Sequence, residues 1–348
     1  MAYTTIDDAS LYFRVKTYTG NSTNNTAITW DETHENMQPD WLWLKQRTTA
    51  NQEHWLADVV RGAGLFLESN SSNADADGTG GFDSFDTNGF TVDDTARTNR
   101  GTMVGWGWKA GGSASSNSDG TITSSVSANT TAGFSIVSYS GTNNNQTVGH
   151  GLGAAPKVII LKNRDTTNNW CVGHGDLGFT KHLALNETDA VGTSSVRFQD
   201  TAPTSSVYSV GAAGETNGSG NDIIAYCLAE KKGYSKFGSY HGNDNADGPV
   251  IYLGFSPSWL MIKRTNSTND WIILDNKRDP DNPSTERLLA NTRDAASTAN
   301  TMVDFLSNGF KPRSTYGGIN GSGDNFVYLA FAESPFVNSA GAVPTNAR

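Results

Sequence analysis

The chain has 348 residues, which suits two or three domains of ordinary size, and charged residues make up only 17% of it. This low charge, with abundant Gly, Ser, Thr and Asn, argues against a disordered polyelectrolyte and favours short strands joined by many turns. The net charge of −10 argues against nucleic acid as a partner, and no apolar run approaches the roughly 20 residues of a membrane-spanning helix, so membrane insertion is not expected.

The stretch 39–56 has the pattern of a β-hairpin. An apolar run at 41–44 is followed by Lys45, Arg47 and a polar tip, and the chain becomes apolar again at Trp55. Short apolar runs with aromatic and β-branched residues, separated by turn formers, are typical of paired strands.

The same pattern occurs twice more, at 156–172 and 257–274. Each copy has a proline, an apolar strand, a lysine, a polar tip and a tryptophan, which makes Trp55, Trp170 and Trp271 corresponding residues. Their spacing, roughly 115 and then roughly 101 residues, is that of whole domains rather than of a solenoid. We therefore predict three related domains in tandem.

The predicted fold is all-β, with three tandem β-sandwich domains of the jelly-roll or concanavalin-like kind and few short helices. The boundaries are 1–110 for the first repeat with a short N-terminal arm, 111–133 for a Ser/Gly/Thr-rich linker, 134–232 for the second repeat, and 233–348 for the third repeat with an extended C-terminal tail. Within the linker, 121–126 could form a short edge strand. The closing strands at 223–228 and 326–331 are apolar on both faces. Each is therefore expected to be central in a sandwich or covered by a neighbour.

A search for chemistry finds no catalytic set, phosphate loop or zinc spacing, so no catalytic, cofactor or metal site is predicted and the ligand-binding residues stay unknown. His150 and His174 lie in Gly-rich segments where an imidazole could bind a metal or act as a base, but exposed loop histidines are the favoured interpretation. The repeated tryptophans could stack on sugars, yet their place at the start of a strand favours the core. Cys171 and Cys227 are expected to be small buried residues, with a disulfide left open.

Three acidic loops, at 73–78, 243–248 and 275–283, are candidate cation sites. Their Asp and Asn oxygens suit calcium, but neither of the first two has the spacing or the closing Glu of an EF-hand. Because Asn, Asp and Gly also form tight turns, ordinary turns are the favoured interpretation.

Longer motifs surround the hairpins over almost the whole chain. They include WLKQR at 43–47, VRGA at 60–63, LESN at 67–70, WGWKAGG at 106–112, SANTTAGFSIV at 127–137, VGHGL at 148–152, AEKKGYSKFG at 229–238 and FAESPF at 331–336. These motifs resemble a family of repeat-bearing virion proteins of tailed, often marine, bacteriophages. The resemblance implies lectin-like sandwich domains and a structural or tail-fibre-like role, and it brings no catalytic residues.

The expected function is therefore that of a non-enzymatic virion structural protein, an exposed tail fibre or adhesin that contacts the host surface. The alternative is a capsid-decorating or tail-connecting architectural protein without a host ligand. Expected partners are other virion proteins, further copies of the chain in a homo-oligomer with a trimer as the guess, and a host-surface glycan as a candidate ligand. The expected location is the virion, assembled in the host cytoplasm. Few residues precede the first repeat, which argues for a compact tip, collar or capsid-surface protein over a long fibre.

Overall fold

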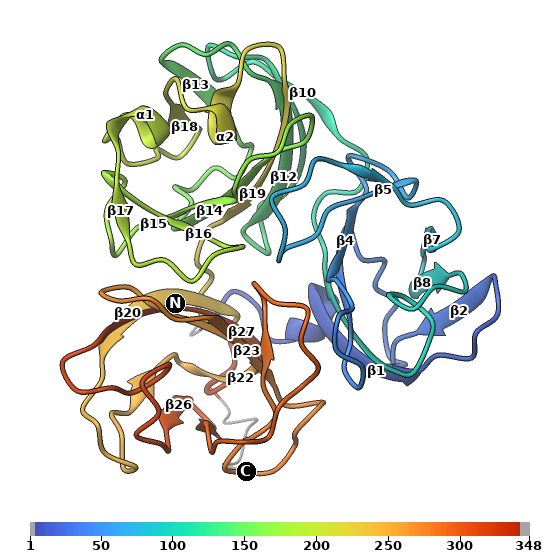
Figure 1. Cartoon of the computed structure of the whole chain (residues 1–348), viewed down its shortest axis with the longest axis vertical. Helices are drawn as coiled ribbons and strands as arrows, with labels where there is room; N and C mark the ends of the chain where they lie inside the picture. Colours follow the sequence, from blue (N-terminus) through green and yellow to red (C-terminus); the bar gives the residue numbers. More distant parts are fainter. Residues whose placement is uncertain (1–3, 342–348) are drawn as a thin grey trace.

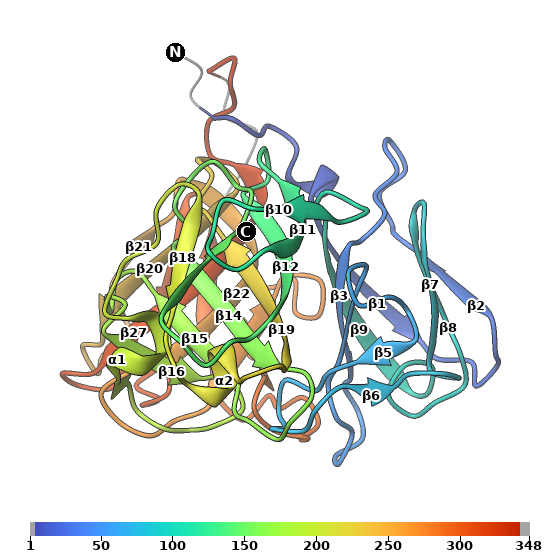
Figure 2. The ribbon, with the colours of Figure 1, turned by 90° about the horizontal axis from the view of Figure 1, so that it is seen from above.

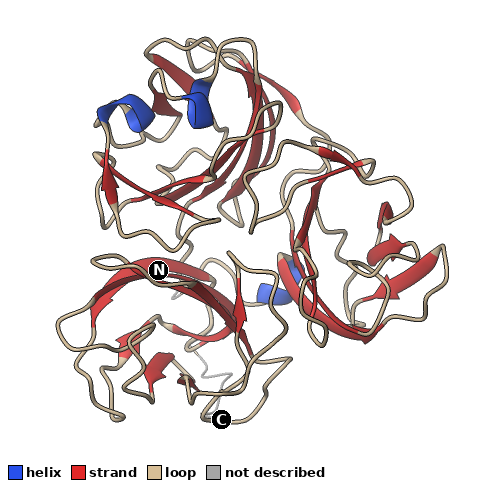
Figure 3. Ribbon diagram, viewed as in Figure 1, coloured by secondary structure: helices blue, strands red, loops and turns tan. Residues whose placement is uncertain are grey.

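The structure, a computed structural model, describes residues 4–341 and is built almost wholly from β-strands (Figure 3). Within this range the helices are short: η1 (Ala9–Leu11), α1 (Ser195–Phe198) and α2 (Gly214–Asn217). The predicted all-β class is confirmed. The C-terminal tail predicted for the third repeat reaches into 342–348, which lie outside the described residues.

Residues 13–108, here called unit 1, form two antiparallel sheets whose inner side chains share one apolar cluster. The larger sheet has the order β1 (Phe13–Thr19), β9 (Thr102–Trp108), β3 (Trp41–Gln46) and β4 (Trp55–Asp58). The smaller sheet has the order β2 (Thr26–Thr29), β8 (Gly89–Val92) and β7 (Phe82–Asp86), and β5 (Leu65–Phe66) pairs with β6 (Ala76–Asp77).

Two further segments, unit 2 (115–228) and unit 3 (235–335), repeat the order of the larger sheet. In unit 2 it is β12 (Phe134–Ser140), β19 (Asp222–Leu228), β14 (Val158–Asn163), β15 (Cys171–His174), β16 (Lys181–Ala184) and β17 (Gly192–Thr193). In unit 3 it is β20 (Ser235–His241), β27 (Asn325–Pro335), β22 (Phe255–Arg264), β23 (Trp271–Asp275) and β24 (Leu288–Leu289). The smaller sheets are β13 (Gln146–Gly149) with β18 (Val207–Val210), and β21 (Ile251–Tyr252), β26 (Gly309–Pro312) and β25 (Val303–Leu306).

The segment 111–133, expected to be a linker, differs from that expectation. It contains β10 (Ser115–Asn117) and β11 (Ser124–Asn129), which extend the larger sheet of unit 2 beyond β12. The Ser- and Thr-rich composition suits an edge of this kind, because alternate residues such as Val126 are buried while Ser125 is exposed.

The three units meet around a common centre (Figure 1), and a view turned by 90° shows unit 1 standing beside the other two (Figure 2). Strand alternation explains how each larger sheet serves two cores. In β3, Leu42 and Leu44 belong to the apolar cluster inside unit 1, while Trp41 and Trp43 belong to a central cluster that all three units share. The closing strands are therefore apolar on both faces because neighbouring units cover their outer face.

Aromatic rings fill this centre. Trp41 of unit 1 stacks on Tyr226 of unit 2 with ring centroids 4.3 Å apart, and Trp108 lies 5.6 Å from Trp259 of unit 3. The large side chains of β9 alternate with glycine because the opposite face has no room: a Cβ at Gly107 would lie 2.7 Å from the Trp30 ring.

A buried asparagine holds the same loop in each unit. Its side-chain oxygen accepts a hydrogen bond from the backbone of the loop that follows the first strand, and its amide donates to carbonyls of the same loop. The residues are Asn99, Asn217 and Asn320, whose Oδ1 atoms accept from Asn21, Thr142 and Asn243 at 3.2, 2.7 and 3.0 Å. A tyrosine hydroxyl fixes the adjacent carbonyl in each unit: Tyr18 donates to Thr98, Tyr139 to Thr216 and Tyr240 to Ile319.

Candidate functional site

The contacts between units, here called joints 1/2, 2/3 and 3/1, follow one pattern that closes into a ring. In each joint a ring N–H at the start of the fourth strand donates to a backbone carbonyl of the neighbouring unit. The pairs are Trp170 to Glu68 at 2.9 Å, Trp271 to Ala184 at 2.8 Å and His54 to Leu289 at 3.0 Å. Unit 2 thus donates to unit 1, unit 3 to unit 2, and unit 1 to unit 3.

The expected correspondence of Trp55 with Trp170 and Trp271 is wrong by one residue. Leu44 pairs with Trp55, whereas the equivalent leucine and isoleucine pair with Cys171 and Ile272. The residue that matches the two joint tryptophans is therefore His54. The backbone N–H groups agree, since those of His54, Trp170 and Trp271 donate to the side chains of Asn70, Asn186 and Asn291.

All three tryptophans are buried, as predicted, so none is an exposed platform for a sugar. Trp55 stacks on Phe66 inside unit 1, with centroids 3.8 Å apart, and takes no part in a joint. The sequence does not reveal this shift, because the hairpin tip of unit 1 is one residue longer than the tips of units 2 and 3.

His54 can replace tryptophan because its tautomer is determined by its neighbours. The indole N–H of Trp43 can only donate, and it lies 2.7 Å from His54 Nδ1, so Nδ1 accepts and Nε2 carries the proton. Burial, reinforced by the Lys45 ammonium, lowers the pKa of His54 well below its ordinary value. The neutral ring then presents an N–H to Leu289 as an indole would.

A buried lysine forms a second set of contacts in the ring. Lys45, Lys162 and Lys263 are each fully buried, and burial lowers the pKa of each to about 8. Their ammonium groups donate to backbone carbonyls across the joints: Lys45 to Arg293 at 3.5 Å, Lys162 to Ser72 at 3.1 Å and Lys263 to Thr188 at 2.8 Å. The recurring lysine in the sequence is thus a joint residue.

Backbone hydrogen bonds complete each joint. An N–H from the hairpin tip donates to the carbonyl that the lysine contacts, and a carbonyl at the end of the third strand accepts from the neighbouring unit. In this second set the N–H groups of Asp75, Val191 and Ala296 donate to the carbonyls of Arg164, Thr265 and Arg47 at 2.8, 2.8 and 2.7 Å. Such paired backbone bonds fix the relative position of the units without depending on side-chain identity.

In joint 1/2 a chain of buried charges fills the space beside these bonds. Arg164 donates to Asp75 at 2.6 Å, and Asp75 also pairs with Arg61 at 2.9 Å. Arg61 pairs in turn with Asp58 at 2.6 Å, and Tyr226 of unit 2 donates to the same carboxylate at 2.8 Å. Burial disfavours the charged guanidinium, but these carboxylates raise the pKa of Arg61 above its ordinary value.

Joint 3/1 has a similar arrangement. Arg278 pairs with Asp275 at 2.5 Å, and Trp106 of unit 1 donates to that carboxylate at 3.0 Å. Arg47 of unit 1 binds Glu286 through both carboxylate oxygens at 2.7 Å. Charged groups therefore fill two of the three joints.

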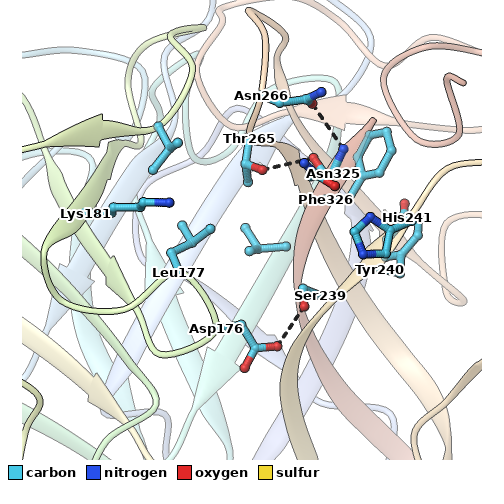
Figure 4. Close-up of a pocket in the computed structure, with 12 residues that line it drawn as sticks. Asp176, Leu177, Lys181, Ser239, Tyr240, His241, Thr265, Asn266, Asn325 and Phe326 are labelled. Carbon is cyan, nitrogen blue, oxygen red and sulfur yellow. Dashed lines mark hydrogen bonds between the residues drawn. The ribbon is translucent and has the colours of Figure 1, made fainter. Parts of the chain in front are cut away.

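Joint 2/3 has shorter or apolar residues at the same places. The shared backbone bonds and the hairpin register give the correspondences. Thr265 occupies the position of Arg47 and Arg164, and Val191 occupies that of Asp75. Leu177 occupies the position of Arg61 and Arg278. A pocket of about 450 Å³ opens here between the two units. Figure 4 shows Lys181 and Leu177 on the unit 2 side facing Tyr240, His241 and Asn325 on the unit 3 side.

The two histidines proposed from the sequence are not exposed. His150 is buried, with Nδ1 accepting from the Leu152 N–H at 3.2 Å and Nε2 3.2 Å from the Thr204 carbonyl oxygen. His174 takes the place of Asp58 and Asp275, and burial lowers its pKa to about 4. Neither ring faces solvent, because both Gly-rich segments turn inward onto the sheet.

Cys171 and Cys227 are buried and unbridged. Burial raises the pKa of both thiols, so they pack as small apolar residues.

The acidic loops use their carboxylates for internal contacts. Asp75 and Asp275 belong to the joints described above, and Asp247 pairs with Lys311 and Arg313. Within residues 4–341 no three His, Cys, Asp or Glu side chains are grouped so that they could hold a metal ion. The same part of the chain contains no helix long and apolar enough to cross a bilayer.

No curated protein and no solved structure matches this chain. One family model does match, over residues 8–335, and its description is a domain of unknown function, DUF7483. Because the match covers both closing strands and all three joints, the chain belongs to the DUF7483 family.

Proposed function

We propose that the protein is a non-enzymatic structural protein of a phage virion, an exposed tail fibre or adhesin that contacts the host surface through a rigid three-unit head. The units are copies of one β-sandwich module, of the jelly-roll or concanavalin-like kind. The shared strand order supports the module, and the motif resemblance supports the virion role.

One observation carries the binding role. Buried charges lie beside the shared backbone bonds in two joints, whereas the third joint has a polar-rimmed pocket of about 450 Å³ at this place. Folds usually place ligand sites in clefts between domains, since two walls can then supply separate contacts. Catalysis is not proposed, because the hydroxyl–carboxylate contact in this pocket, Ser239 to Asp176, uses a carboxylate that is already paired with Lys157.

The architectural alternative, a capsid-decorating or tail-connecting protein, has its own support. Val250 and Tyr252, two positions apart in the chain, line one surface hollow of unit 3 and are 59% and 55% exposed. Adjacent exposed apolar side chains on a soluble protein are common at protein–protein contacts.

Two measurements test the proposal. Cryo-electron microscopy of the virion that encodes the chain is expected to place it at the tail tip, collar or capsid surface. Purified protein is expected to bind host cell envelopes in a sedimentation assay. Virion placement without envelope binding would favour the architectural role, and absence from the virion would refute both.

The expected homo-oligomer, with a trimer as the guess, stays a prediction. The single chain already arranges three units around one centre (Figure 1), so light scattering after size-exclusion chromatography is needed to count the copies. A mass of about 37 kDa, that of one chain, would contradict the homo-oligomer.

A further inference from the structure

The pocket in joint 2/3 is open because Thr265, Val191 and Leu177 replace the charged residues of joint 1/2. Its floor is apolar, formed by Leu177 and Val191 of unit 2 and by Phe326 of unit 3. In joint 1/2 the ion pairs between Arg164, Asp75 and Arg61 occupy the equivalent space. Backbone hydrogen bonds hold both joints equally, so the opening comes from side-chain replacement at an intact interface.

The rim of the pocket is polar and comes from both units. Thr265 and Asn266 lie on one side, and the side chain of Asn325 offers an amide that no other described residue binds. The Thr265 hydroxyl donates to the Asn325 carbonyl at 3.1 Å, and the Asn266 oxygen accepts from its backbone N–H at 3.1 Å (Figure 4). These bonds hold the rim in place before any ligand arrives.

The unpaired charge at the rim is the Lys181 ammonium. Asp176 is already neutralised by Lys157 at 2.5 Å and accepts from Ser239 across the joint at 2.9 Å. Lys181 and His241, by contrast, have no side-chain hydrogen bond or ion pair with any residue in the range 4–341. A ligand in the pocket therefore meets an apolar floor, neutral amide and hydroxyl groups, and an unpaired ammonium.

The pocket continues along the joint. A second hollow of about 470 Å³ shares Asp176, Ser239 and Tyr240 with it and ends at the exposed ring of Tyr252. Each volume lies within the roughly 300–1,000 Å³ of small-molecule sites. The joint can thus hold a chain of several ring-sized units, with an aromatic face at its outer end.

We propose that joint 2/3 is the binding site for a saccharide that carries a carboxylate on one sugar ring. The apolar floor would contact the C–H face of that ring, Asn266 and Asn325 would bind its hydroxyl groups, and Lys181 would bind the carboxylate. Charge-assisted hydrogen bonds of this kind are stronger than neutral ones. The inference rests on the proposed surface-binding function and names its ligand class and its site.

The test uses four forms of the full chain on an array of acidic and neutral saccharides. They are the wild type, Lys181→Met, the control Lys277→Met at an exposed lysine outside the pocket, and a pocket-closing double variant, Thr265→Arg with Val191→Asp, which copies the Arg164–Asp75 pair of joint 1/2. We expect the wild type to bind acidic saccharides, the control to bind equally, Lys181→Met to bind about tenfold more weakly, and the double variant to lose binding. Circular dichroism and the melting temperature check that each form is folded.

Three outcomes would overturn the site: no binding of acidic saccharides, binding of neutral saccharides only, or unchanged binding by a folded double variant. If the double variant does not fold, Asn325→Ala, which removes an amide that hydrogen-bonds to no residue in 4–341, takes its place with the same expected weakening. The envelope assay keeps the two proposals apart. Envelope binding by the wild type and the pocket-closed chain alike would leave the surface-binding function standing and reject this pocket, whereas no envelope binding by the wild type would reject the function itself.

Discussion

Joints 1/2 and 2/3 share a backbone arrangement and differ in what fills it. Both have an indole N–H bound to a carbonyl, a buried lysine and a pair of backbone hydrogen bonds across the interface. Beside them, joint 1/2 has buried arginine–aspartate pairs, and joint 2/3 has a histidine, a leucine and an open pocket. The comparison teaches that the backbone and its few repeated partners hold the ring, while the remaining side chains are free to diverge.

Removing a joint tryptophan tests the shared part and has the largest expected effect. Trp271→Ala leaves a large cavity in the central core and removes the hydrogen bond to the Ala184 carbonyl, so a loss of about 3–5 kcal/mol in unfolding free energy is expected. Trp271→Phe keeps most of the ring and removes the N–H, with an expected loss of about 1 kcal/mol from that bond. Urea denaturation measures both, and an unchanged midpoint for Trp271→Ala would contradict the central role of this residue.

Changing the buried charges of joint 1/2 tests the part that differs. Asp58→Ala leaves Arg61 without its nearest carboxylate, and breaking such a pair costs about 3 kcal/mol or more. The double variant Asp58→His with Arg61→Leu copies His174 and Leu177 of joint 2/3 and removes both charges.

The double variant is expected to recover at least half of the loss seen in Asp58→Ala, measured by the same urea titration. Recovery is expected because no unpaired charge stays buried. A double variant less stable than Asp58→Ala would mean that joint 1/2 depends on its charges more than the comparison implies.

Lowering the pH tests joint 2/3, because the buried His174 makes a pH-dependent contribution to the stability. Its pKa of about 4 in the folded chain lies below the ordinary 6.5, so the unfolded chain binds more protons between these values. The stability that the neutral ring contributes is complete above pH 6.5 and is lost as the pH falls toward 4, with about 2 kcal/mol lost by pH 5.

His174→Asn should reduce this acid loss, because its side-chain oxygen can still accept from the Asp176 N–H as Nδ1 does. Melting temperatures at pH 7 and pH 5 measure the effect, with His34→Asn as the exposed control. Equal acid sensitivity of wild type and His174→Asn would count against this origin.

The smallest expected effect concerns the buried lysines. Lys162→Met removes the bond to Ser72 but also removes a buried charge, so the change at pH 7 is expected to stay within about 1 kcal/mol. The pKa of Lys162 is about 8 in the folded chain and takes the ordinary value of 10.5 in the unfolded chain. The unfolded chain therefore binds more protons between these values, so the wild type should gain stability as the pH rises from 8 to 10.5. Denaturation at pH 8 and pH 10 should show a smaller gain in Lys162→Met.

The sequence was informative about strands and uninformative about how units meet. Short continuous apolar runs identified β3, β14 and β22 and their partner strands, and the closing strands that are apolar on both faces indicated a cover on the outside. The role of His54 could not be predicted this way, because no sequence pattern equates histidine with tryptophan. Only the strand register shows that His54 makes the same hydrogen bond across its joint as Trp170 and Trp271 make across theirs. The recurrence of Lys45, Lys162 and Lys263 was evident in the sequence. A lysine at the end of a hairpin strand is nevertheless expected to be exposed unless a carbonyl of a neighbouring unit is known to bind it.

The pocket was beyond sequence reasoning for a related reason. Its walls come from 176–191 and 239–327, and its existence depends on what Thr265, Val191 and Leu177 lack compared with their counterparts. Such absences become meaningful only when the three joints are laid over one another, which requires the correct register. The linker-like composition of 111–133 misled for the opposite reason, since Ser and Thr suit an exposed edge strand as well as a loop.

Closure of the ring has a mechanical consequence. In a linear array an end domain can separate after one interface breaks. Here each unit contacts both of the others, so displacing any one of them requires two interfaces to break together. Peptide links between units then contribute little to their placement, and a protease cut near residue 113 should leave a nicked particle that still migrates as a whole. A head built in this manner would transmit a pull on one unit directly to the other two.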